Sequence, residues 1–581
     1  MDFRALDLML PAAALALLAG CGSSMPTRRF PLQDAMWRDD DARPFNAACK
    51  PDPKKPGHAV CVPEEYESPF VWDGVNLMVF HPMTRLFAVD PAGESVNVNA
   101  MDEVPDSSWF TNRIGRTPMT PDDLAKGVCD EKILHADDPD GSWVIDQGKE
   151  NGANPGFRVN IQGVGKFLLK ADEGDHPERA TGATSIATRF YHAAGFFTSC
   201  DSVVYVRRSL LKLTPGLSHS DNTGVTRAFG EKQLAKVLNG ASKRGELYRM
   251  VASKWLPGHP LGPFQYEGVR KDDPNDVILH QDRRELRGQR VLAAWLNHFD
   301  SREQNSMNTW LPVNAKETDA SPGHIQHWIM DLNDCFGSEW QWESLTKRIG
   351  SSYYFDGKEI GRDFVTLGIP ERPWDKVQRH PDGDIFGFFE SEQFEPAEWK
   401  GGYQNPAFLR MSEKDGAWMA RILARFTREH VEAAVRVGDF TDPKHTAFLA
   451  RTLLERQRKI LARYFAKVSP LADLAVHDGQ LCGVDLARKT ETFEPSRFRY
   501  SAVVHTGPEL ERTEAVAVSV LPEGRACVTL PRISAEAGER DDAPSRYLVV
   551  TLHNGQADEP LRAHLYDLGP TKGYRLVGIE R

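Results

Sequence analysis

Hydrophobic and polar residues alternate in short runs between residues 142 and 208. Runs of this kind predict strands at SWVID (142–146), FRVNI (157–161) and KFLLKAD (166–172). The segment GKENGANPG (148–156), which lies between the first two runs, is rich in glycine and favours a turn. The pattern therefore predicts three consecutive strands joined by turns.

A helix and a further strand follow these runs. An apolar stripe at helical spacing indicates the helix, and Gly195 is suited to end it; the stripe consists of Ile186, Phe190, Tyr191 and Ala194. DSVVYVRR (201–208) is typical of another strand. The predicted order is strand, Gly-rich loop, strand, strand, helix, strand.

Helical periodicity prevails in the next part of the chain. One buried helix face is predicted between residues 283 and 299 by Leu292, Trp295, Leu296 and Phe299. NTWLPV (308–313) and HIQHWIMDLN (324–333) then predict two strands, the second ending at Asp331. Residues 412–468 show amphipathic helical patterns again.

The composition of the chain changes near residue 485. From Phe498 onward the sequence consists of short alternating runs, which are RYSAVVH, EAVAVSVL, RACVTL, RYLVVTLH, LRAHLYDL and YRLVGI. Several short strands at regular spacing predict an all-β sandwich at the carboxyl end.

Length and charge limit the possible functions. A chain of 581 residues is too long for one compact domain and predicts two to four units. The net charge of −11 repels phosphate backbones, so a nucleic acid is not expected as a partner. The sequence also lacks the G-x-S-x-G and HExxH motifs of common hydrolases.

The first residues resemble a bacterial lipoprotein signal. LMLPAAALALLAG (8–20) is an apolar run of signal-peptide length, and small residues precede Cys21. In that class the thiol of this cysteine carries acyl chains such as palmitate, which would anchor the chain to a membrane outside the cytoplasm. Gly22, in place of Asp, favours the outer over the inner membrane. The alternative is an ordinary secretory signal with a chance cysteine.

Export from the cytoplasm would permit disulfides. Cys49 and Cys61 bracket a loop rich in Pro, Lys and Gly, and we predict that they form a local disulfide. The remaining cysteines show no CxxC pair and no zinc spacing, so we interpret most of them as small buried apolar residues; they are Cys129, Cys200, Cys335, Cys482 and Cys527.

NHFDSREQN (297–305) contains a His, an Asp and an Asn at the spacing His-x-Asp-x-x-x-x-Asn. Asp300 could supply a catalytic carboxylate and Asn305 a metal-binding amide. Phosphoryl transfer needs a carboxylate near the attacking hydroxyl and oxygen ligands for a divalent metal. Asp331, at the end of a predicted strand, could supply a second metal ligand. The alternative is that Asp300 and Asp331 cap turns.

The region from 148 to 178 offers groups for binding phosphates. Lys170 ends the third predicted strand in FLLK and could contact them, while Gly152 and Gly156 lie in a loop whose backbone N–H groups could cover them. Glu178 could orient Lys170. The alternatives are a hairpin turn, a solvent-facing lysine, and a glutamate that favours a helix N-terminus.

This part of the chain resembles the atypical protein-kinase-like superfamily, and in particular the CotH-type and HipA-type kinases. DLNDCFG (331–337) is similar to the CotH pattern Asp-Leu-Asp-x-x-Phe-Gly, with Asn333 in place of the second acid, and Phe299 replaces the Arg of the kinase HRD motif. The resemblance covers residues 140–345, and the helices up to residue 475 would complete the larger lobe.

The resemblance implies a two-lobed fold that holds ATP and Mg²⁺ or Mn²⁺ in its cleft. Lys170 would hold phosphates with help from Glu178, Asp300 would position the acceptor, and Asn305 and Asp331 would bind the metal.

The expected fold class is therefore α+β, with a two-lobed protein-kinase-like core, a largely helical C-lobe and a C-terminal all-β sandwich. The predicted units are a lipoprotein signal peptide (1–21), a polar tether and N-terminal extension (22–100), a kinase-like N-lobe (101–210), a mostly helical C-lobe (211–480) and the β-sandwich (486–581).

Two functions are compatible with these features. The first is a membrane-anchored, extracytoplasmic kinase-like protein that transfers phosphoryl groups from ATP to a protein acceptor. The second is a catalytically inactive surface lipoprotein of kinase fold that serves adhesion or cell-envelope binding. The sequence identifies neither the acceptor nor the oligomeric state.

Overall fold

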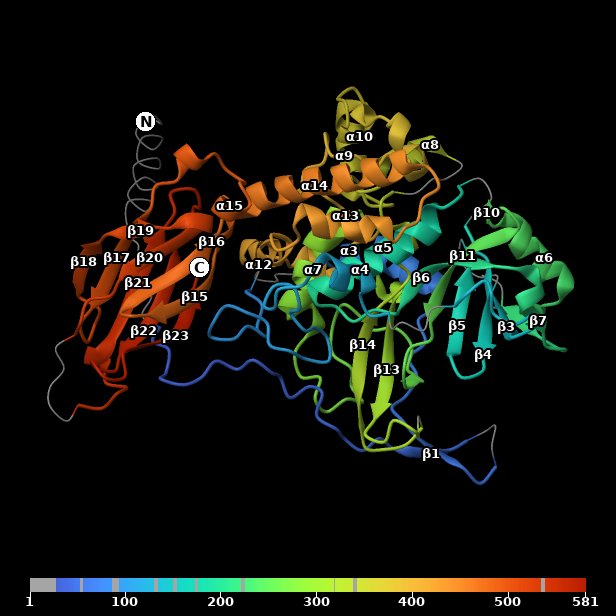
Figure 1. The fold of residues 1–581 in the computed structure, drawn as a ribbon, viewed down its shortest axis with the longest axis horizontal. Helices are drawn as coiled ribbons and strands as arrows, with labels where there is room; N and C mark the ends of the chain where they lie inside the picture. Colours follow the sequence, from blue (N-terminus) through green and yellow to red (C-terminus); the bar gives the residue numbers. More distant parts are fainter. Residues whose placement is uncertain are drawn as a thin grey trace, which may run out of the picture.

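Helices and strands are mixed in the computed structural model of the chain, and the strands belong to several separate sheets (Figure 1). The structure describes residues 28–52, 56–85, 93–129, 134–149, 154–172, 176–220, 225–317, 319–337, 342–533 and 539–581. Cys21 and Gly152 lie outside these ranges. A β-sandwich occupies one end of the molecule, a second large sheet the other end, and helices lie between them (Figure 1).

The sheet at the end opposite the sandwich contains the predicted strands of the Gly-rich region. Its strands run in the order β10-β11-β5-β4-β3-β7, and β6 also pairs with β11. Alternate side chains are buried, and α6 (Glu231–Gly240) contributes Leu234, Val237 and Leu238 to the same core. The bounds are β3 (Trp143–Lys149), β4 (Gly156–Ile161), β5 (Gly165–Lys170), β6 (Asp201–Val206), β7 (Leu211–Leu213), β10 (Lys243–Arg244) and β11 (Leu247–Lys254).

The predicted boundary at residue 210 is too early for this sheet. β11 lies between β5 and β10, inside the range predicted to be mostly helical. Buried Arg249 interrupts the apolar pattern of β11. The arginine can be buried there because its guanidinium donates to the carbonyls of Gly438 and Asp439. A buried cation in mid-strand removes the periodic signal by which a strand is recognised.

The helix α5 (Arg179–Ala194) connects this sheet to the helical layer. Every residue of α5 except His192 is buried, and the helix packs against β6, β11, α4 and α13. Gly195 ends it at φ 135°, a conformation that glycine adopts without strain. The stripe predicted for this helix therefore lies on a helix that is buried on all sides.

The helical layer consists mainly of α7 (Arg284–Leu296), α12 (Glu413–Leu423), α13 (Arg428–Arg436) and α14 (Pro443–Phe465). Its core includes an edge-to-face contact of Trp295 with Phe190 of α5 and a tilted contact of Trp295 with Phe426. Among the residues described, no helix is both long and apolar enough to cross a membrane. The other helices are α2 (Phe70–Val75), α3 (His81–Arg85), α4 (Pro121–Lys126), α8 (Glu343–Arg348), α9 (Gly357–Thr366), α10 (Pro373–Lys376), α11 (Pro406–Leu409) and α15 (Leu486–Lys489).

Two strands form a hairpin after α7, as the pattern predicts. β13 (Ser306–Pro312) pairs antiparallel with β14 (Gly323–Ile329), and the short β12 (His259–Pro260) adds a third strand. β14 ends two residues before Asp331. Two small antiparallel pairs stand apart, which are β1 (Cys49–Pro51) with β2 (Ala59–Cys61) and β8 (Ser218–Ser220) with β9 (Thr226–Ala228). A disulfide joins Cys49 to Cys61 across the first pair.

The carboxyl end forms two sheets, ordered β15-β16-β20-β19 and β18-β17-β21-β22-β23, and apolar residues of both share one core. The predicted start at residue 486 is too late, because β15 and β16 already pair within the first sheet. The bounds are β15 (Leu471–His477), β16 (Gln480–Asp485), β17 (Ser501–Thr506), β18 (Arg512–Val516), β19 (Val518–Val520), β20 (Arg525–Thr529), β21 (Tyr547–His553), β22 (Leu561–Asp567) and β23 (Tyr574–Glu580).

The polar N-terminal segment is bound to the body of the protein, contrary to the predicted tether. Phe30 packs against the sandwich, and its backbone N–H and carbonyl bond to the hydroxyls of Tyr547 and Tyr566. Further along, the carboxylate of Asp41 accepts from the backbone N–H and hydroxyl of Ser108. Buried Phe30 and buried Asp41 therefore fix a segment that its composition alone describes as a linker.

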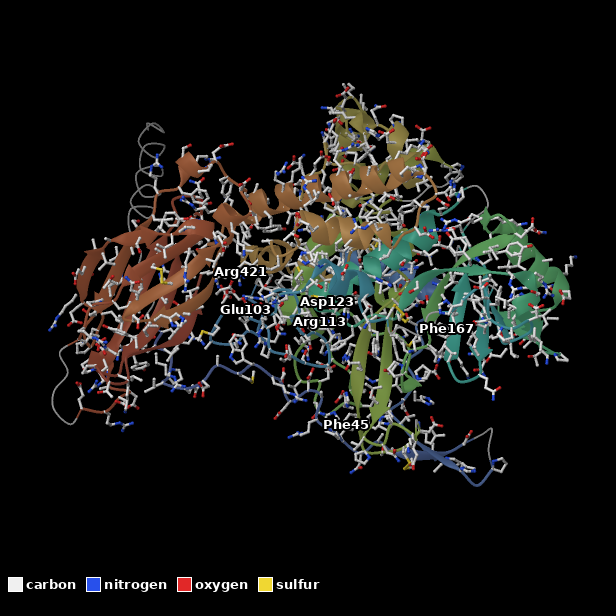
Figure 2. All side chains as sticks on the ribbon, in the orientation of Figure 1. Phe45, Glu103, Arg113, Asp123, Phe167 and Arg421 are labelled. Atoms are coloured by element: carbon white, nitrogen blue, oxygen red, sulfur yellow. A yellow bond between two sulfur atoms is a disulfide. The ribbon has the colours of Figure 1, made fainter. Side chains whose placement is uncertain are left out.

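Asp102 joins three parts of the chain. Its carboxylate accepts from Arg284 of α7 at 2.5 Å, from Arg421 of α12 at 3.1 Å and from Arg581 beyond β23 at 2.5 Å. Figure 2 labels Arg421 and the neighbouring Glu103 at this junction. Burial alone would raise the pKa of Asp102, but the three guanidinium groups outweigh burial and lower it well below its ordinary value.

We expect Asp102→Ala to lower the free energy of unfolding by about 3–5 kcal/mol, because three buried cations lose their shared carboxylate. Since the pKa of Asp102 is lowered on folding, its contribution is present at neutral pH and disappears as the pH falls below about 4. Chemical unfolding at neutral and acidic pH measures both effects.

Asp558→Ala is the matched control, because it removes an exposed ion pair with Lys467 at 2.8 Å. It should cost at most about 1 kcal/mol. Equal losses for the two variants would contradict the role of Asp102.

Candidate functional site

Lys170 and Asp331 meet although they lie far apart in the sequence. Lys170 is the last residue of β5, Asp331 follows β14, and Nζ of Lys170 donates to Oδ1 of Asp331 at 2.6 Å. Burial alone would raise the pKa of Asp331, but its ion pair with Lys170 lowers it. The carboxylate is therefore ionised at neutral pH, with Lys170 as its counter-ion.

Asp331 adopts a left-handed backbone conformation, at φ 54° and ψ 57°. This conformation is uncommon for residues other than glycine and persists only where the surroundings enforce it. Here the N-terminus of α5 supplies that support, since Arg179 donates to the carbonyls of Asn333 and Gly337. The side chain of Asn333 also donates to Oδ1 of Asn154, which belongs to the Gly-rich segment, at 2.6 Å.

Glu178 does not orient Lys170, contrary to prediction. It is the N-cap residue of α5 at φ 66°, and its carboxylate accepts from the backbone N–H and the hydroxyl of Thr441. This left-handed cap turns the side chain toward the loop between α13 and α14. Asp331, and not Glu178, is the carboxylate that pairs with Lys170.

Gly156 does not lie in the predicted loop either. It is the first residue of β4 and pairs with Lys170 of β5. A Cβ at this position would lie 2.1 Å from the carbonyl oxygen of Leu169, so the glycine permits close strand pairing. Its role in the structure is to place β4 against the strand that carries Lys170.

Asp300 and Asn305 contact each other directly. Nδ2 of Asn305 donates to the backbone carbonyl of Asp300 at 2.7 Å and to its carboxylate at 2.9 Å. Arg302 forms an ion pair with the same carboxylate at 2.9 Å. Burial raises the pKa of Asp300 despite the opposing effect of Arg302, and the neighbouring Asp334 raises it further.

His298 supports this loop from inside. Its Nδ1 lies 2.7 Å from the hydroxyl of Tyr191 on α5, and its Nε2 lies 3.5 Å from Oδ1 of Asp334. Burial lowers the pKa of His298 to about 4, so the ring is neutral at pH 7 and shares a hydrogen bond with the tyrosine hydroxyl through Nδ1. His298 therefore positions the loop and does not supply a charge.

The two halves of the predicted site are adjacent. The backbone N–H of Met330 donates to the carbonyl of Asn305 at 3.0 Å, so the residue before Asp331 is fixed to the end of the Asp300–Asn305 loop. The backbone N–H of Asp300 donates to Asp334 at 2.9 Å, which links the loops a second time. The prediction missed Asp334, although it lies only three residues after Asp331 in the same motif.

A cavity of about 250 Å³ lies beside the Lys170–Asp331 pair. Its walls come from β3, β5, the start of β6, the end of β11 with the segment after it, β13, and the residues that follow β14; they include Lys149, Asp201, Trp255 and Met307. In the described part of the chain, Asp300 and Asn305 are not among its lining residues. The cavity can hold a small molecule with its polar end at Lys170 and Asp331.

Lys149 brings a second cation to this cavity. It ends β3, and its Nζ donates to the carbonyl of Asn154 at 2.9 Å. Burial lowers the pKa of Lys149 to about 8, and the nearby charge of Lys170 contributes to the shift. Lys149, Lys170 and Lys254 line the cavity against two carboxylates, Asp201 and Asp331, and this excess of positive charge suits a ligand with phosphate groups. Sequence reasoning missed Lys149, although it stands in the same Gly-rich segment.

The side chains of Asp331 and Asn305 carry oxygen atoms, which are the type of ligand that Mg²⁺ prefers. Lys170 donates to Oδ1 of Asp331, and the amide nitrogen of Asn305 donates to Asp300. Oδ2 of Asp331 and Oδ1 of Asn305 are therefore the atoms that could bind a metal. Mg²⁺ commonly takes one or two protein oxygens together with phosphates and water. Across the described ranges, no group of three or more His, Cys, Asp and Glu side chains forms a self-sufficient metal site.

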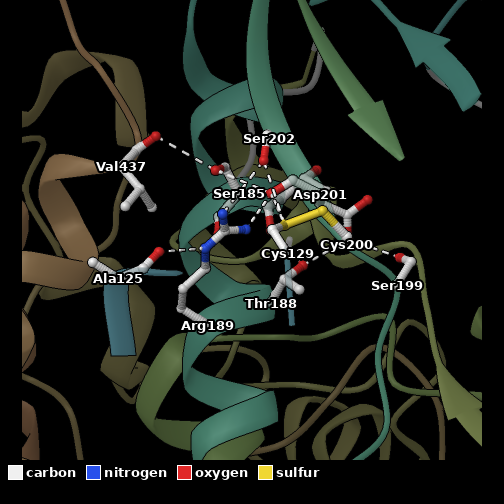
Figure 3. The surroundings of a disulfide bond; sticks show 11 residues. Ala125, Cys129, Ser185, Thr188, Arg189, Ser199, Cys200, Asp201, Ser202 and Val437 are labelled. Carbon is white, nitrogen blue, oxygen red and sulfur yellow. Dashed lines mark hydrogen bonds between the residues drawn. A yellow bond between two sulfur atoms is a disulfide. The ribbon is translucent and has the colours of Figure 1, made fainter. Parts of the chain in front are cut away.

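A disulfide between Cys129 and Cys200 anchors one wall of the cavity (Figure 3). The adjacent Asp201 accepts from the hydroxyls of Thr188 and Ser199 at 2.7 and 2.8 Å, and Arg189 donates to its carbonyl. The interpretation of most scattered cysteines as unpaired buried residues is wrong, because Cys482 and Cys527 are also bonded; Cys335 is free and buried. The sequence does not show which cysteines pair when they lie far apart along the chain, because the fold decides which of them meet.

We expect the double variant Cys129→Ser/Cys200→Ser to be about 2–4 kcal/mol less stable than the wild type, because the bond closes a loop of 71 residues. It should also weaken ligand binding in the cavity, since Ser199 and Asp201 line it. Thermal unfolding and ligand titration would measure the two effects. Cys482→Ser/Cys527→Ser, which removes the disulfide of the sandwich, should lower stability without weakening that binding.

Comparisons with known proteins do not assign the chain to a family. No protein-family model matches it, and no curated protein or solved structure matches it either.

Proposed function

We propose that the chain is a kinase-like phosphotransferase that uses ATP and Mg²⁺ or Mn²⁺ to modify a protein acceptor. The observation that carries the proposal is the pair of buried Lys170 and Asp331 at the wall of a ligand-sized cavity, beside the Asp300–Asn305 loop. A phosphate-binding cation, a metal-binding carboxylate and a second carboxylate near the acceptor are the groups that phosphoryl transfer needs.

The arrangement of the elements supports a two-lobed core. The sheet β3–β5 with α5 would form the smaller lobe, and α7, the hairpin β13–β14 and α12–α14 the larger one. Lys170 comes from the first group, and Asp300, Asn305 and Asp331 come from the second. A nucleotide between the lobes would thus contact groups from both.

Each residue has a distinct role in this proposal. Lys170 and Lys149 bind phosphate oxygens, Asp331 and Asn305 hold the metal, and Asp300 orients the acceptor hydroxyl. The bound metal would neutralise charge on the phosphates. Glu178 takes no part, because its carboxylate is bound to Thr441.

The proposed location is the outer face of the cell envelope, with lipid on Cys21 as the anchor. The lipobox-like residues before Cys21 and the three disulfides support export to an oxidising compartment. The packing of Phe30 on the sandwich would then hold the sandwich close to the anchor.

A second candidate is an inactive surface protein that keeps the kinase-like framework for binding. The observation that favours it is the ion pair between Arg302 and Asp300, since it engages the carboxylate that would orient the acceptor. The β-sandwich would then be the functional module. Binding of a nucleotide without transfer would agree with this candidate.

We expect the full chain to bind ATP in the presence of Mg²⁺ or Mn²⁺, and Lys170→Ala and Asp331→Ala to weaken binding about tenfold or more, because each removes a charged contact. Calorimetric titration measures the affinity, and radiolabelled ATP detects transfer. Lys166→Ala is the matched control, since Lys166 is exposed on the same strand, and it should bind as the wild type does. A wild type that binds no nucleotide with either metal would refute the proposal.

We also expect the affinity for ATP to fall on the order of tenfold between about pH 7 and pH 9, since Lys149, with its pKa near 8, loses its charge over this range. Arginine stays protonated, so Lys149→Arg should bind equally well at both pH values. The same fall in wild type and Lys149→Arg would exclude Lys149 as its source. Calorimetry at the two pH values decides between these results.

A further inference from the structure

A second cavity, of about 270 Å³, lies where the β-sandwich meets the helical layer. β15 and β23 form one wall, α12 with Arg425 forms another, and residues 101–116 close a third side. Because three separate parts of the chain build this junction cavity, its shape depends on how the sandwich is docked.

Positive charge exceeds negative charge on the lining of the junction cavity. Four arginines line it, against two carboxylates, Glu103 and Asp473; the arginines are Arg116, Arg421, Arg425 and Arg581. Asp102, behind the wall, is shared among Arg284, Arg421 and Arg581. Arg421 also pairs with Glu103 at 3.4 Å, and Arg116 pairs with Asp106 at 3.7 Å. Burial lowers the pKa of Arg581 to about 10, and the nearby cation Arg421 adds to this shift.

Several polar atoms of the junction are left without partners. Nε and Nη1 of Arg421 are buried, as is Oδ1 of Asn112, and these atoms find no hydrogen-bond partner among the described residues. Arg421 as a whole is 4% exposed. Arg581 differs, because it donates to the carbonyls of Ser469 and Leu471 as well as to Asp102. Buried guanidinium donors without acceptors carry a free-energy cost that an anion would offset.

The remaining lining is apolar and partly aromatic. Trp418 and Ile422 of α12 face the cavity together with Leu576 of β23. Arg116 lies over the ring of Trp37 with its guanidinium carbon 4.3 Å from the ring centroid. An inorganic ion would leave this apolar surface uncovered, whereas a ligand with an apolar body would cover it.

We propose that the junction cavity binds a small organic anion, with its carboxylate or phosphate group near Arg421 and Arg425 and its apolar body against Trp418 and Ile422. The site is separate from the Lys170 cavity and does not depend on the proposed phosphotransferase activity. A bound anion would connect the sandwich to the helical layer, because Arg425 also pairs with Asp473 of β15 at 2.8 Å.

The test uses the full chain and four probes of similar size, which are benzoate, phenyl phosphate, benzylamine and benzyl alcohol. We expect saturable binding and a raised melting temperature with benzoate or phenyl phosphate, and neither effect with the cationic and neutral probes. Either anion supports the proposal, and the stronger of the two identifies the headgroup. The proposal fails if no anion binds, or if benzyl alcohol binds as tightly as the anions.

Variants locate the binding. Arg425→Gln removes one cation, and Met101→Trp fills the space without touching an arginine; each should weaken anion binding by about tenfold or more. Arg463→Gln, which removes a partly exposed arginine paired with Glu413, and Lys170→Ala, which alters the other cavity, should both leave anion binding unchanged. Folding of each variant is checked by its unfolding transition. Unchanged binding in folded Arg425→Gln and Met101→Trp, or lost binding in Lys170→Ala, would overturn the assignment.

Discussion

The carboxylate of Asp102 draws together arginines from α7, from α12 and from the end of the sandwich. Removing charged side chains from water is costly, and this cost is recovered only when each charge meets its counter-charge in good geometry. The helical layer and the sandwich can therefore bury Arg284, Arg421 and Arg581 only in the arrangement in which all three reach Asp102. The position of the sandwich, and with it the shape of the junction cavity, depends on this one carboxylate.

A similar constraint operates at the other end of the molecule. Lys170 arrives on a strand and Asp331 on a loop after a hairpin, and each compensates the burial of the other. The helix α5 stabilises the contact from behind, since Arg179 holds the loop after Asp331 and Tyr191 reaches His298. Because α5 is buried along nearly its whole length, it holds the sheet and the loop that carries Asp300 in a fixed relative position.

Both cavities lie between layers of the structure, and the lining of each carries more cations than carboxylates. At the first, Lys149 and Lys170 face Asp331; at the second, Arg421 and Arg425 stand beside apolar side chains. The excess of cations on the two linings would attract anionic ligands, although the chain as a whole is acidic. The apolar residues of each lining favour an organic anion over a bare inorganic ion.

The sequence by itself determined local structure. Period-two and helical periodicity predicted β3, β4, β5, α5, β6 and the hairpin β13–β14 in their correct order, because the alternation of buried and exposed positions repeats over neighbouring residues. The prediction failed at β11, where buried Arg249 breaks that alternation, and it began the sandwich after β15 and β16. It also described the segment around Phe30 as a tether, since composition does not show what an aromatic residue packs against.

Only the tertiary structure decided which residues meet. It paired Lys170 with Asp331 and turned Glu178 toward Thr441, and it joined Cys129 to Cys200. These contacts link residues far apart in sequence, so no local period encodes them. The balance between desolvation and pairing that selects them exists only once the layers have packed.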